Sequence, residues 1–296
     1  FSKVLTGVYD IPAAHLRVRG VYTNTTQVDA YRGAGRPEAI HVLERCMDEA
    51  ARVLGTDPFA LRRSNFITRF PHASATGEVI DSGDFGLVLD RAAAAADVAG
   101  FDARRAGSAR AGRLRGLGLC CYVEAILGDP TETARLCFAP DGTVALHVGT
   151  QSNGQGHETA YARHLARESG IPVAMIRIVQ GDSDRIARGG GTGGSRSVTV
   201  QTNATRAAVA GLVAALEPFL AGELGAAPEF ADGAFRAPGS NRTLTLLEAV
   251  ALARAAGRDD LTGFAATATL DGRSYPNGAH VAEVEVDPET GQVVLL

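Results

Sequence analysis

Apolar residues in the first third of the chain recur at helical spacing. Between Pro37 and Gly55 they return every three or four residues, at Ala39, Leu43, Cys46, Met47, Ala50 and Leu54. Such spacing places them on one helical face, while Pro suits the first helical position and Gly the residue after the last. The pattern therefore predicts a helix over 37–54, followed by further helices over 58–65 and 84–98.

The remainder of the chain mixes short strand-like runs with helices. Apolar and β-branched runs predict strands over 117–126, 133–138, 143–148, 175–179, 264–270 and 280–286, with a last strand at the C-terminal end. Helical spacing predicts helices over 157–168, 195–217 and 245–256. Pro218 is expected to stop or kink the second of these helices, and Thr245 and Glu248 form a capping box for the third.

Helices and strands that mix without strict βαβ alternation favour an α+β fold. A stretch rich in Arg, Gly and Ser over 107–115 is the candidate boundary between two halves, which gives parts at 1–110 and 111–296. We expect both parts to be incomplete, the first at its N-terminus and the second at its C-terminus. The chain starts at Phe1 without an initiator Met and ends in a strand-like run, so we expect a fragment of a longer polypeptide.

Composition narrows the classes of partner. The 296 residues carry a net charge of −4, with 45% hydrophobic and 21% charged residues, and no basic run is interleaved with aromatics, so nucleic-acid binding is not expected. No apolar run approaches the ~20 residues of a membrane span. The cysteines form no C-x-x-C pair, which argues against an iron–sulfur or zinc-ribbon site in this chain and favours reduced thiols in the cytoplasm. They are Cys46, Cys120, Cys121 and Cys137.

Three glycine-bearing loops carry the candidate chemistry. They read AYRGAGRPE over 30–38, GTQSNGQGHET over 149–159 and RGGGTGGSRS over 188–197, and each leads into a predicted helix. Glycine lets the backbone approach a ligand closely, and the free amides at a helix start favour an anionic group such as phosphate. The second and third loops are joined by only one helix and one strand, which suggests a large phosphorylated cofactor held from two sides.

Other interpretations of these loops are weaker. Gly189-x-Gly191-x-x-Gly194 formally matches the dinucleotide fingerprint, but the polar stretch over 182–188 separates it from its strand. A phosphate-binding P-loop is excluded because no Lys follows any glycine-rich run. His157 and His164 stand seven residues apart on one helix, whereas the zinc protease motif needs a spacing of four.

Single charged residues near these loops decide nothing by themselves. Asp182 and Asp184 form either a carboxylate pair or, several times more often for such a pattern, a solvated turn. Three arginines serve either as phosphate ligands or as ordinary surface charges: Arg32, Arg36 and Arg196.

In combination, the three loops are specific. Their order and wide spacing, together with the segment YPNGAHVAEV over 275–284, resemble the molybdenum-binding large subunit of the xanthine dehydrogenase and aldehyde oxidase family. The resemblance covers essentially the whole chain and is strongest to the bacterial branch that includes carbon monoxide dehydrogenases.

The resemblance implies a molybdopterin dinucleotide, the cytosine form in most bacterial members, lying between two mixed α/β halves of a molybdopterin-binding domain. The Arg32 loop comes near the molybdenum ligands in that family, and Gln155 would hydrogen-bond the pterin or an oxo ligand. No residue of the chain is expected to ligate the metal directly. The expected cofactor-binding residues are Arg32, Gly33, Gln155, Gly156, His157, Thr192, Gly194, Ser195, Arg196 and Ser197.

The resemblance also implies an activity and partners. Members hydroxylate an aldehyde or an N-heterocycle with oxygen from water, and a glutamate acts as the base. Electrons would pass to a [2Fe–2S] small subunit and an FAD medium subunit, in a cytoplasmic dimer of heterotrimers.

Two departures from the family pattern limit this expectation. True carbon monoxide dehydrogenases carry a copper-binding cysteine where this chain has Gly33, and Cu(I) needs a soft thiolate, so CO oxidation is disfavoured. The family's base glutamate is expected beyond Leu296, and neither Glu78 nor Glu223 is assigned that role, although each follows a Gly. The chain alone is therefore expected to be inactive. The alternatives are a cofactor-binding or assembly module without turnover, and an unrelated glycine-rich nucleotide-binding fold.

Overall fold

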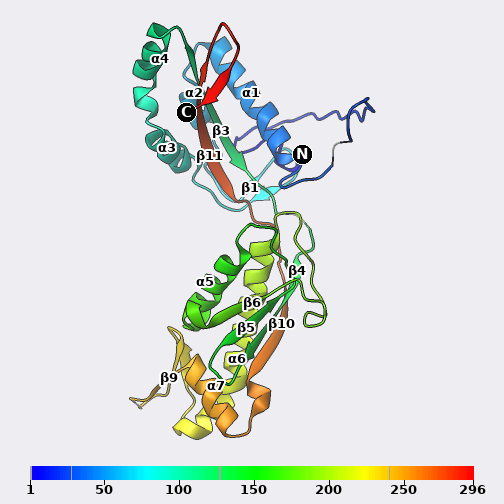
Figure 1. Ribbon diagram of the computed structural model, residues 1–296, viewed down its shortest axis with the longest axis vertical. Coiled ribbons are helices and arrows are strands. Elements are labelled where there is room, and N and C mark those ends of the chain that lie inside the picture. Colours follow the sequence, from blue (N-terminus) through cyan, green and yellow to red (C-terminus); the bar gives the residue numbers. More distant parts are fainter. Residues whose placement is uncertain (1, 28, 127, 240) are drawn as a thin grey trace. The chain divides into compact units, whose positions relative to one another are not determined.

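The computed structural model describes residues 2–27, 29–126, 128–239 and 241–296, and the chain divides into two compact units (Figure 1). Unit 1 consists of Phe1–Ile126 and Ser274–Leu296, and unit 2 consists of Leu127–Arg273. The chain therefore leaves unit 1 once and returns to it for its last two strands. Each unit has helices, a sheet and a core of its own.

Unit 1 is built on an antiparallel three-stranded sheet in the order β12-β11-β3. Strand β11 pairs with β3 over the full length of both, from Asn277 opposite Val123 to Val286 opposite Leu114. The elements of this unit are η1 (Ser2–Val4), α1 (Arg36–Leu54), α2 (Pro58–Asn65), β1 (His72–Ala73), β2 (Val79–Ile80), α3 (Phe85–Ala95), η2 (Val98–Gly100), α4 (Phe101–Arg110), β3 (Leu114–Val123), β11 (Asn277–Val286) and β12 (Val293–Leu295).

The helix limits in unit 1 follow local chemistry. Gly55 ends α1 in the left-handed region at φ 63°, as expected for a residue that closes a helix. Asp57 and Asp84 accept backbone hydrogen bonds from Ala60 and Leu87 and so cap α2 and α3. These caps confirm the helices predicted over 37–54, 58–65 and, with an earlier end at Ala95, 84–98.

The compact units do not follow the boundary expected at residue 110. The Arg- and Gly-rich stretch is no linker, because it lies at the end of α4 and the start of β3. Full-length pairing with β11 keeps β3 in unit 1, so the chain crosses to unit 2 only after Ile126. Helix α4 was not predicted, since its own sequence has no clear apolar face.

Unit 2 contains a mixed four-stranded sheet in the order β10-β4-β5-β6, in which β5 and β6 are parallel and the other pairs antiparallel. Helix α6 packs on β4 and β10, and α5 packs on α6 and β6 (Figure 1). The elements are β4 (Thr131–Phe138), β5 (Val144–Val148), α5 (His157–Ser169), η3 (Val173–Met175), β6 (Ile176–Val179), α6 (Ser197–Leu224), β7 (Glu229–Ala231), β8 (Ala234–Arg236), β9 (Thr243–Thr245), α7 (Leu246–Ala255), η4 (Asp259–Leu261) and β10 (Gly263–Thr269).

Helix α6 is the centre of unit 2 and differs from its prediction at both ends. It starts at Ser197 because Ser195 adopts a left-handed φ of 60°, and it continues through Pro218 to Leu224. The buried residues Leu212, Leu216 and Leu220 run past the proline along one face, so packing against the sheet outweighs one lost backbone hydrogen bond. Among the described residues α6 alone is long and apolar enough to span a membrane, and here that apolar face lies in the core.

The predicted α+β fold class is confirmed. The hairpin expected at 140–142 is present between β4 and β5, where Gly142 at φ 83° donates its N–H to the carbonyl of Ala139 at 3.1 Å. The capping box of α7 is present as well. The small sheet β7-β8-β9 and the pair β1-β2 were not predicted, because strands of two or three residues carry no readable periodicity.

Candidate functional site

Two of the glycine loops meet in unit 2. We name residues 149–156 the first turn and residues 189–195 the second turn. Their backbones touch at Gly149 and Gly189: a Cβ added to Gly189 would lie 2.4 Å from the Cα of Gly149. The N–H of Gly191 donates to the carbonyl of Gly149 at 3.2 Å. Neither contact position leaves room for a side chain, so glycine is required at both for the turns to touch.

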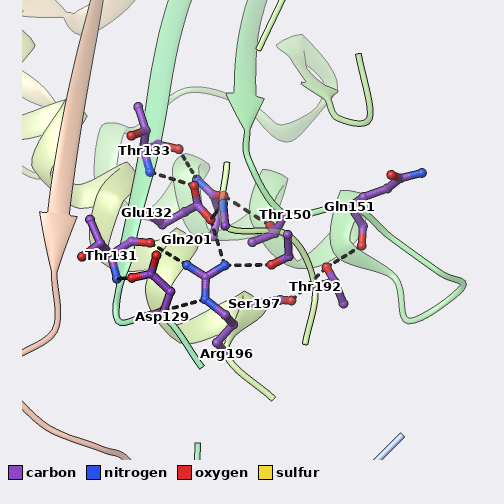
Figure 2. A network of polar contacts seen from close by, with 12 residues as sticks. Asp129, Thr131, Glu132, Thr133, Thr150, Gln151, Thr192, Arg196, Ser197 and Gln201 are labelled. Carbon is purple, nitrogen blue, oxygen red and sulfur yellow. Dashed lines mark hydrogen bonds and ion pairs between the residues drawn. The ribbon is translucent and has the colours of Figure 1, made fainter. Parts of the chain in front are cut away.

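A buried ion pair lies under this contact (Figure 2). Arg196, only 2% exposed, follows the second turn, and its Nη1 lies 3.0 Å from Oε2 of Glu132 on β4. The guanidinium also donates to three backbone carbonyls, those of Asp129, Thr131 and Gly191. Arg196 is thus directed to acceptors of its own unit. It holds the second turn from inside and does not present its charge to a phosphate.

A second set of polar contacts continues the network towards α5 and α6. The hydroxyls of Thr150 and Tyr161 lie 2.7 Å apart, and Thr150 also donates to the side chain of Gln201 at 3.3 Å. Gln201 in turn donates to the carbonyl of Thr133 at 3.1 Å. Burial raises the pKa of Tyr161 to about 12, so its hydroxyl stays protonated. The first turn is therefore anchored to the sheet and to both helices.

Hydroxyls on the second turn connect it to the first. Thr192 donates from Oγ1 to the carbonyl of Gln151 at 2.6 Å, and Ser197 donates from Oγ to Oγ1 of Thr192 at 3.1 Å (Figure 2). A cavity of about 300 Å³ opens where the turns meet the loop after β6. It is lined by Val148, Gly149, Gln151, Gly181, Asp182, Ser183, Ile186, Gly189 and Gly191.

Both turns end at helix starts that suit an anion. Gly156 precedes α5 at φ 78° and Arg196 precedes α6, and neither residue makes a side-chain cap with any described part of the chain. Exposed backbone amides at such positions bind phosphate or other anions. A Cβ added to Gly156, Gly191 or Gly193 would meet no described atom within 4 Å, so the space beside these glycines is open. The donors and the open space fit the phosphate and pterin edges of a dinucleotide cofactor.

His157 lies inside unit 2 rather than on the open side of the first turn. It is 1% exposed, its ring centroid lies 4.8 Å from that of Tyr161, and its Nδ1 has no partner among the described residues. Burial lowers its pKa, against the opposing effects of Glu158 and of a backbone hydrogen bond with Thr150. The imidazole is therefore neutral at pH 7.

Acid should destabilise the protein through three buried histidines, His147, His157 and His164, whose pKa values are all lowered, chiefly by burial. The unfolded chain binds these protons at a higher pH than the folded one, so stability is complete above about pH 6.5 and falls as the pH drops through that value towards the folded pKa. Thermal unfolding measured from pH 7.5 to 5.5 should show this decline, and it should be shallower in His157→Gln. The exposed His15 offers the control His15→Gln, and a slope that is identical in all three proteins would contradict the assignment.

The remaining glycine loop, over 30–38, belongs to unit 1. Gly33 adopts φ 74° and accepts the backbone N–H of Arg36 at 2.9 Å, while the guanidinium of Arg32 lies 5.8 Å from the ring centroid of the exposed Tyr31. Arg36 pairs with Glu124 at 2.9 Å and donates to the carbonyl of Ala125, so it fixes this loop to the end of β3. Of the expected cofactor residues, Arg32 and Gly33 thus lie in unit 1, and all the others lie in or beside the two turns of unit 2.

Sequence reasoning missed the residues beneath the turns, above all Glu132. One signal was readable in the sequence. Glu132 is separated by an even number of residues from the buried Ala134, Leu136 and Phe138, so its charged side chain lies on the face of β4 that packs against the core. A charged side chain on the core-facing side of a strand needs a buried partner of opposite charge. Its partner, Arg196, is 64 residues away in sequence, which no local pattern reveals.

The weaker interpretations find no support. The Gly189-x-Gly191-x-x-Gly194 match does not join a strand to a helix, since β6 ends at Val179 and α6 starts at Ser197. The ring nitrogens of His164 hydrogen-bond the backbone carbonyl of Thr202 and the side chain of Arg167. Asp182 caps a turn by accepting hydrogen bonds from the N–H groups of Asp184 and Arg185. Within the described residues, no group of three or more His, Cys, Asp or Glu could hold a metal ion.

Comparison with known proteins agrees with this geometry. The chain matches the molybdopterin cofactor-binding domain family twice, over residues 1–66 and 91–296. It is 36% identical to the carbon monoxide dehydrogenase large chain of Afipia carboxidovorans, over 70% of this chain and 28% of that one. It is 31% identical to the nicotine 6-hydroxylase large subunit of Paenarthrobacter nicotinovorans, over 97% of this chain and 38% of that one.

A solved structure shares the fold over almost the whole chain. The Cu,Mo-CO dehydrogenase in its carbon monoxide reduced state superimposes with a TM-score of 0.88 and 30% identity, over 99% of this chain and 40% of the other. The fold and the family matches thus define a chain of the class that binds a molybdopterin cofactor. It belongs to the molybdopterin cofactor-binding domain family, as part of a molybdenum-binding large subunit of the xanthine dehydrogenase type, a family of molybdenum-containing oxidoreductases.

Proposed function

We propose that this chain holds the cofactor in a molybdenum hydroxylase that adds water-derived oxygen to an aldehyde or an N-heterocycle. The observation that carries the proposal is the pair of glycine turns, fixed backbone to backbone and leading to two helix starts whose N-cap residues make no side-chain cap within the described residues. The chain spans 28% and 38% of the length of the two relatives described above, so the reaction belongs to a larger protein. The nicotine 6-hydroxylase supports an N-heterocycle as the substrate class, because nicotine contains one.

Each of the two turns would bind a different part of the cofactor. Backbone amides of Gly156, Gly194 and Ser195 would bind the phosphate and pterin edges, and the side-chain amide of Gln155 would hydrogen-bond the pterin or a metal ligand. Thr192 on the second turn and Ser197 at the start of α6 add hydroxyls, while His157 and Arg196 support the turns from within. When bound, molybdopterin supplies the two-electron redox centre of the reaction. The dinucleotide is proposed to be the cytosine form.

The loop in unit 1 supports hydroxylation rather than carbon monoxide oxidation with copper. Gly33 offers no side chain, and none of the four cysteines lies in that loop, because Cys46 is in α1, Cys120 and Cys121 are in β3 and Cys137 is in β4. Soft Cu(I) requires a thiolate ligand. We therefore place the protein with the hydroxylases, with Arg32 and Gly33 near the metal end of the cofactor.

The base glutamate is proposed to lie beyond Leu296. Glu78 is buried, accepts a hydrogen bond from Tyr275 at 2.8 Å and pairs with Lys3 at 2.6 Å, which suits a structural role. The alternative function, a cofactor-binding or assembly module without turnover, applies if the complete polypeptide has no such glutamate. Turnover of an aldehyde or N-heterocycle by the full-length protein separates the two, since a module would bind cofactor and convert neither.

The proposed reaction releases electrons, so the full protein needs partner subunits that accept them. An iron–sulfur small subunit and an FAD medium subunit would accept the electrons, in a dimer of heterotrimers located in the cytoplasm. The names of the relatives, which are a large chain and a large subunit, support assembly with other subunits. The four free cysteines agree with a reducing compartment.

Removal of the Gln155 side chain tests the cofactor assignment. Gln155 is exposed, and its Oε1 accepts hydrogen bonds from the backbone of Asn153 and the hydroxyl of Ser152 within the first turn. Gln155→Ala should therefore leave the fold outside this turn intact and lower molybdenum content or hydroxylation rate about tenfold, as expected for one lost strong hydrogen bond. Molybdenum is measured by elemental analysis and the nucleotide by acid release and chromatography. The exposed Gln292 in unit 1 gives the control Gln292→Ala. Unchanged metal and rate in Gln155→Ala would remove Gln155 from the site, and nucleotide without molybdenum in the native protein would refute the proposed function.

A further inference from the structure

The carboxylate of Glu132 touches both glycine turns at once. Its Oε2 accepts the backbone N–H of Gly190 in the second turn at 3.0 Å. On the side of the first turn, a Cβ added to Gly149 would lie 2.3 Å from Oε1 of Glu132, so the carboxylate packs directly against that backbone.

Among the described residues, all the hydrogen-bond partners of this carboxylate are N–H donors. Oε1 accepts from the backbone of Thr133 at 2.9 Å, and Oε2 accepts from Gly190 and from Nη1 of Arg196, both at 3.0 Å. An ionised carboxylate accepts at both oxygens, whereas an amide of the same shape must turn its NH2 towards one of these donors. The site is therefore built for a charged acceptor and does not tolerate glutamine without losing a contact.

Burial makes it costly to lose any of these hydrogen bonds. Glu132 and Arg196 are both 2% exposed, so water cannot replace a lost partner. Arg196 also fixes the second turn, because it donates to the carbonyl of Gly191 at 2.7 Å and to those of Asp129 and Thr131 at the start of β4. Together the two charges fix the second turn to the sheet at the point where the first turn leaves β5 after Val148.

We propose that Glu132 is a positioning residue for the cofactor: its buried carboxylate sets the spacing of the two turns, and this spacing is needed for molybdopterin dinucleotide to be retained. The proposal rests on the proposed function for the identity of the ligand. Glu132 acts through the turns and through Arg196, and it does not itself contact the cofactor.

The test replaces the carboxylate by its amide in the full-length protein with its partner subunits. Glu132→Gln should lower molybdenum and released nucleotide per protein at least about tenfold, the size expected for a lost hydrogen bond to a charged group. Hydrogen exchange followed by mass spectrometry should show faster exchange in 149–156 and in 189–195 together, and no change in α7. The shorter Glu132→Asp keeps the charge and should retain more cofactor than Glu132→Gln.

A second buried ion pair provides the matched control. Glu44 pairs with Arg62 in unit 1, with side chains 5% and 0% exposed, so Glu44→Gln breaks a comparable pair that belongs to the other unit. If Glu132 positions the turns, Glu44→Gln should lower the unfolding temperature without faster exchange in 149–156 or 189–195. Equal exchange in both turns for Glu132→Gln and the native protein, or full cofactor retention in Glu132→Gln, would overturn the proposal. Absence of molybdopterin from the native protein would instead refute the proposed function.

Discussion

Replacing Gly149 by alanine is expected to disrupt unit 2 and abolish cofactor binding. The added methyl group would lie 2.5 Å from the Cα of Gly189 and 2.3 Å from Oε1 of Glu132. Neither neighbour can withdraw, because one is backbone and the other is a carboxylate fixed by three N–H donors. Overpacking of this kind costs about 3 kcal/mol, and the turns can relieve it only by separating.

The loss should be visible as a fall in unfolding temperature of about 6–12 °C and as absence of molybdenum from the purified full-length protein. Gly189→Ala should behave in the same way, since its methyl group would meet Gly149 from the opposite side. Gly222, exposed in α6 with open space beside it, gives the control Gly222→Ala, which should be neutral or slightly stabilising. Normal metal content in Gly149→Ala would show that the turns do not need their close contact.

Replacing Arg62 by methionine should strongly destabilise unit 1. Arg62 is fully buried in α2, where its Nε pairs with Glu44 at 2.9 Å and its Nη2 with Asp48 at 2.8 Å. Glu44 also accepts hydrogen bonds from the hydroxyl of Tyr9 at 2.6 Å and from the backbone of Cys121 at 3.0 Å. Removal of the arginine leaves a buried carboxylate without its cation, which costs about 3–5 kcal/mol.

The neighbouring arginine provides a direct comparison. Arg63 is next in α2, has a half-exposed side chain and pairs with the exposed Asp90, so Arg63→Met should change the free energy of unfolding by less than about 1 kcal/mol. Chemical denaturation of both variants measures the difference. The double variant Glu44→Gln with Arg62→Met should recover part of the loss, because it removes both charges. Similar stabilities for Arg62→Met and Arg63→Met would show that the buried pair is not needed.

Local patterns predicted most of the fold because the elements concerned carry local signals. Helix α1 has Pro37 near its start, an apolar face and Gly55 at its end, and α7 has a capping box. The β4–β5 hairpin has a turn that needs glycine at a positive φ. Helix α4 and the small sheet β7-β8-β9 lack such signals, so they were found only in the structure.

The candidate site shows the same division. Residues proposed to bind the cofactor through the backbone, such as Gly156 and Gly194, stand in glycine runs that can be read directly. The residues that hold those runs in place are dispersed, and the pairing of Glu132 with Arg196 joins β4 to the start of α6 across 64 positions. Arg196 itself was among the expected cofactor-binding residues, but its buried partners are not visible in its own stretch of sequence.

By itself, the sequence determined the helices and strands with strong periodicity, the three glycine loops and the family to which they belong, since all of these depend on residues close to one another in the chain. Only the tertiary structure decided that the compact units divide after Ile126, that α6 passes through Pro218, and that one buried carboxylate joins two turns. The physical reason is that pairing with β11, burial against the sheet and the desolvation of Glu132 each depend on partners distant in sequence, and their free energies outweigh the local preferences.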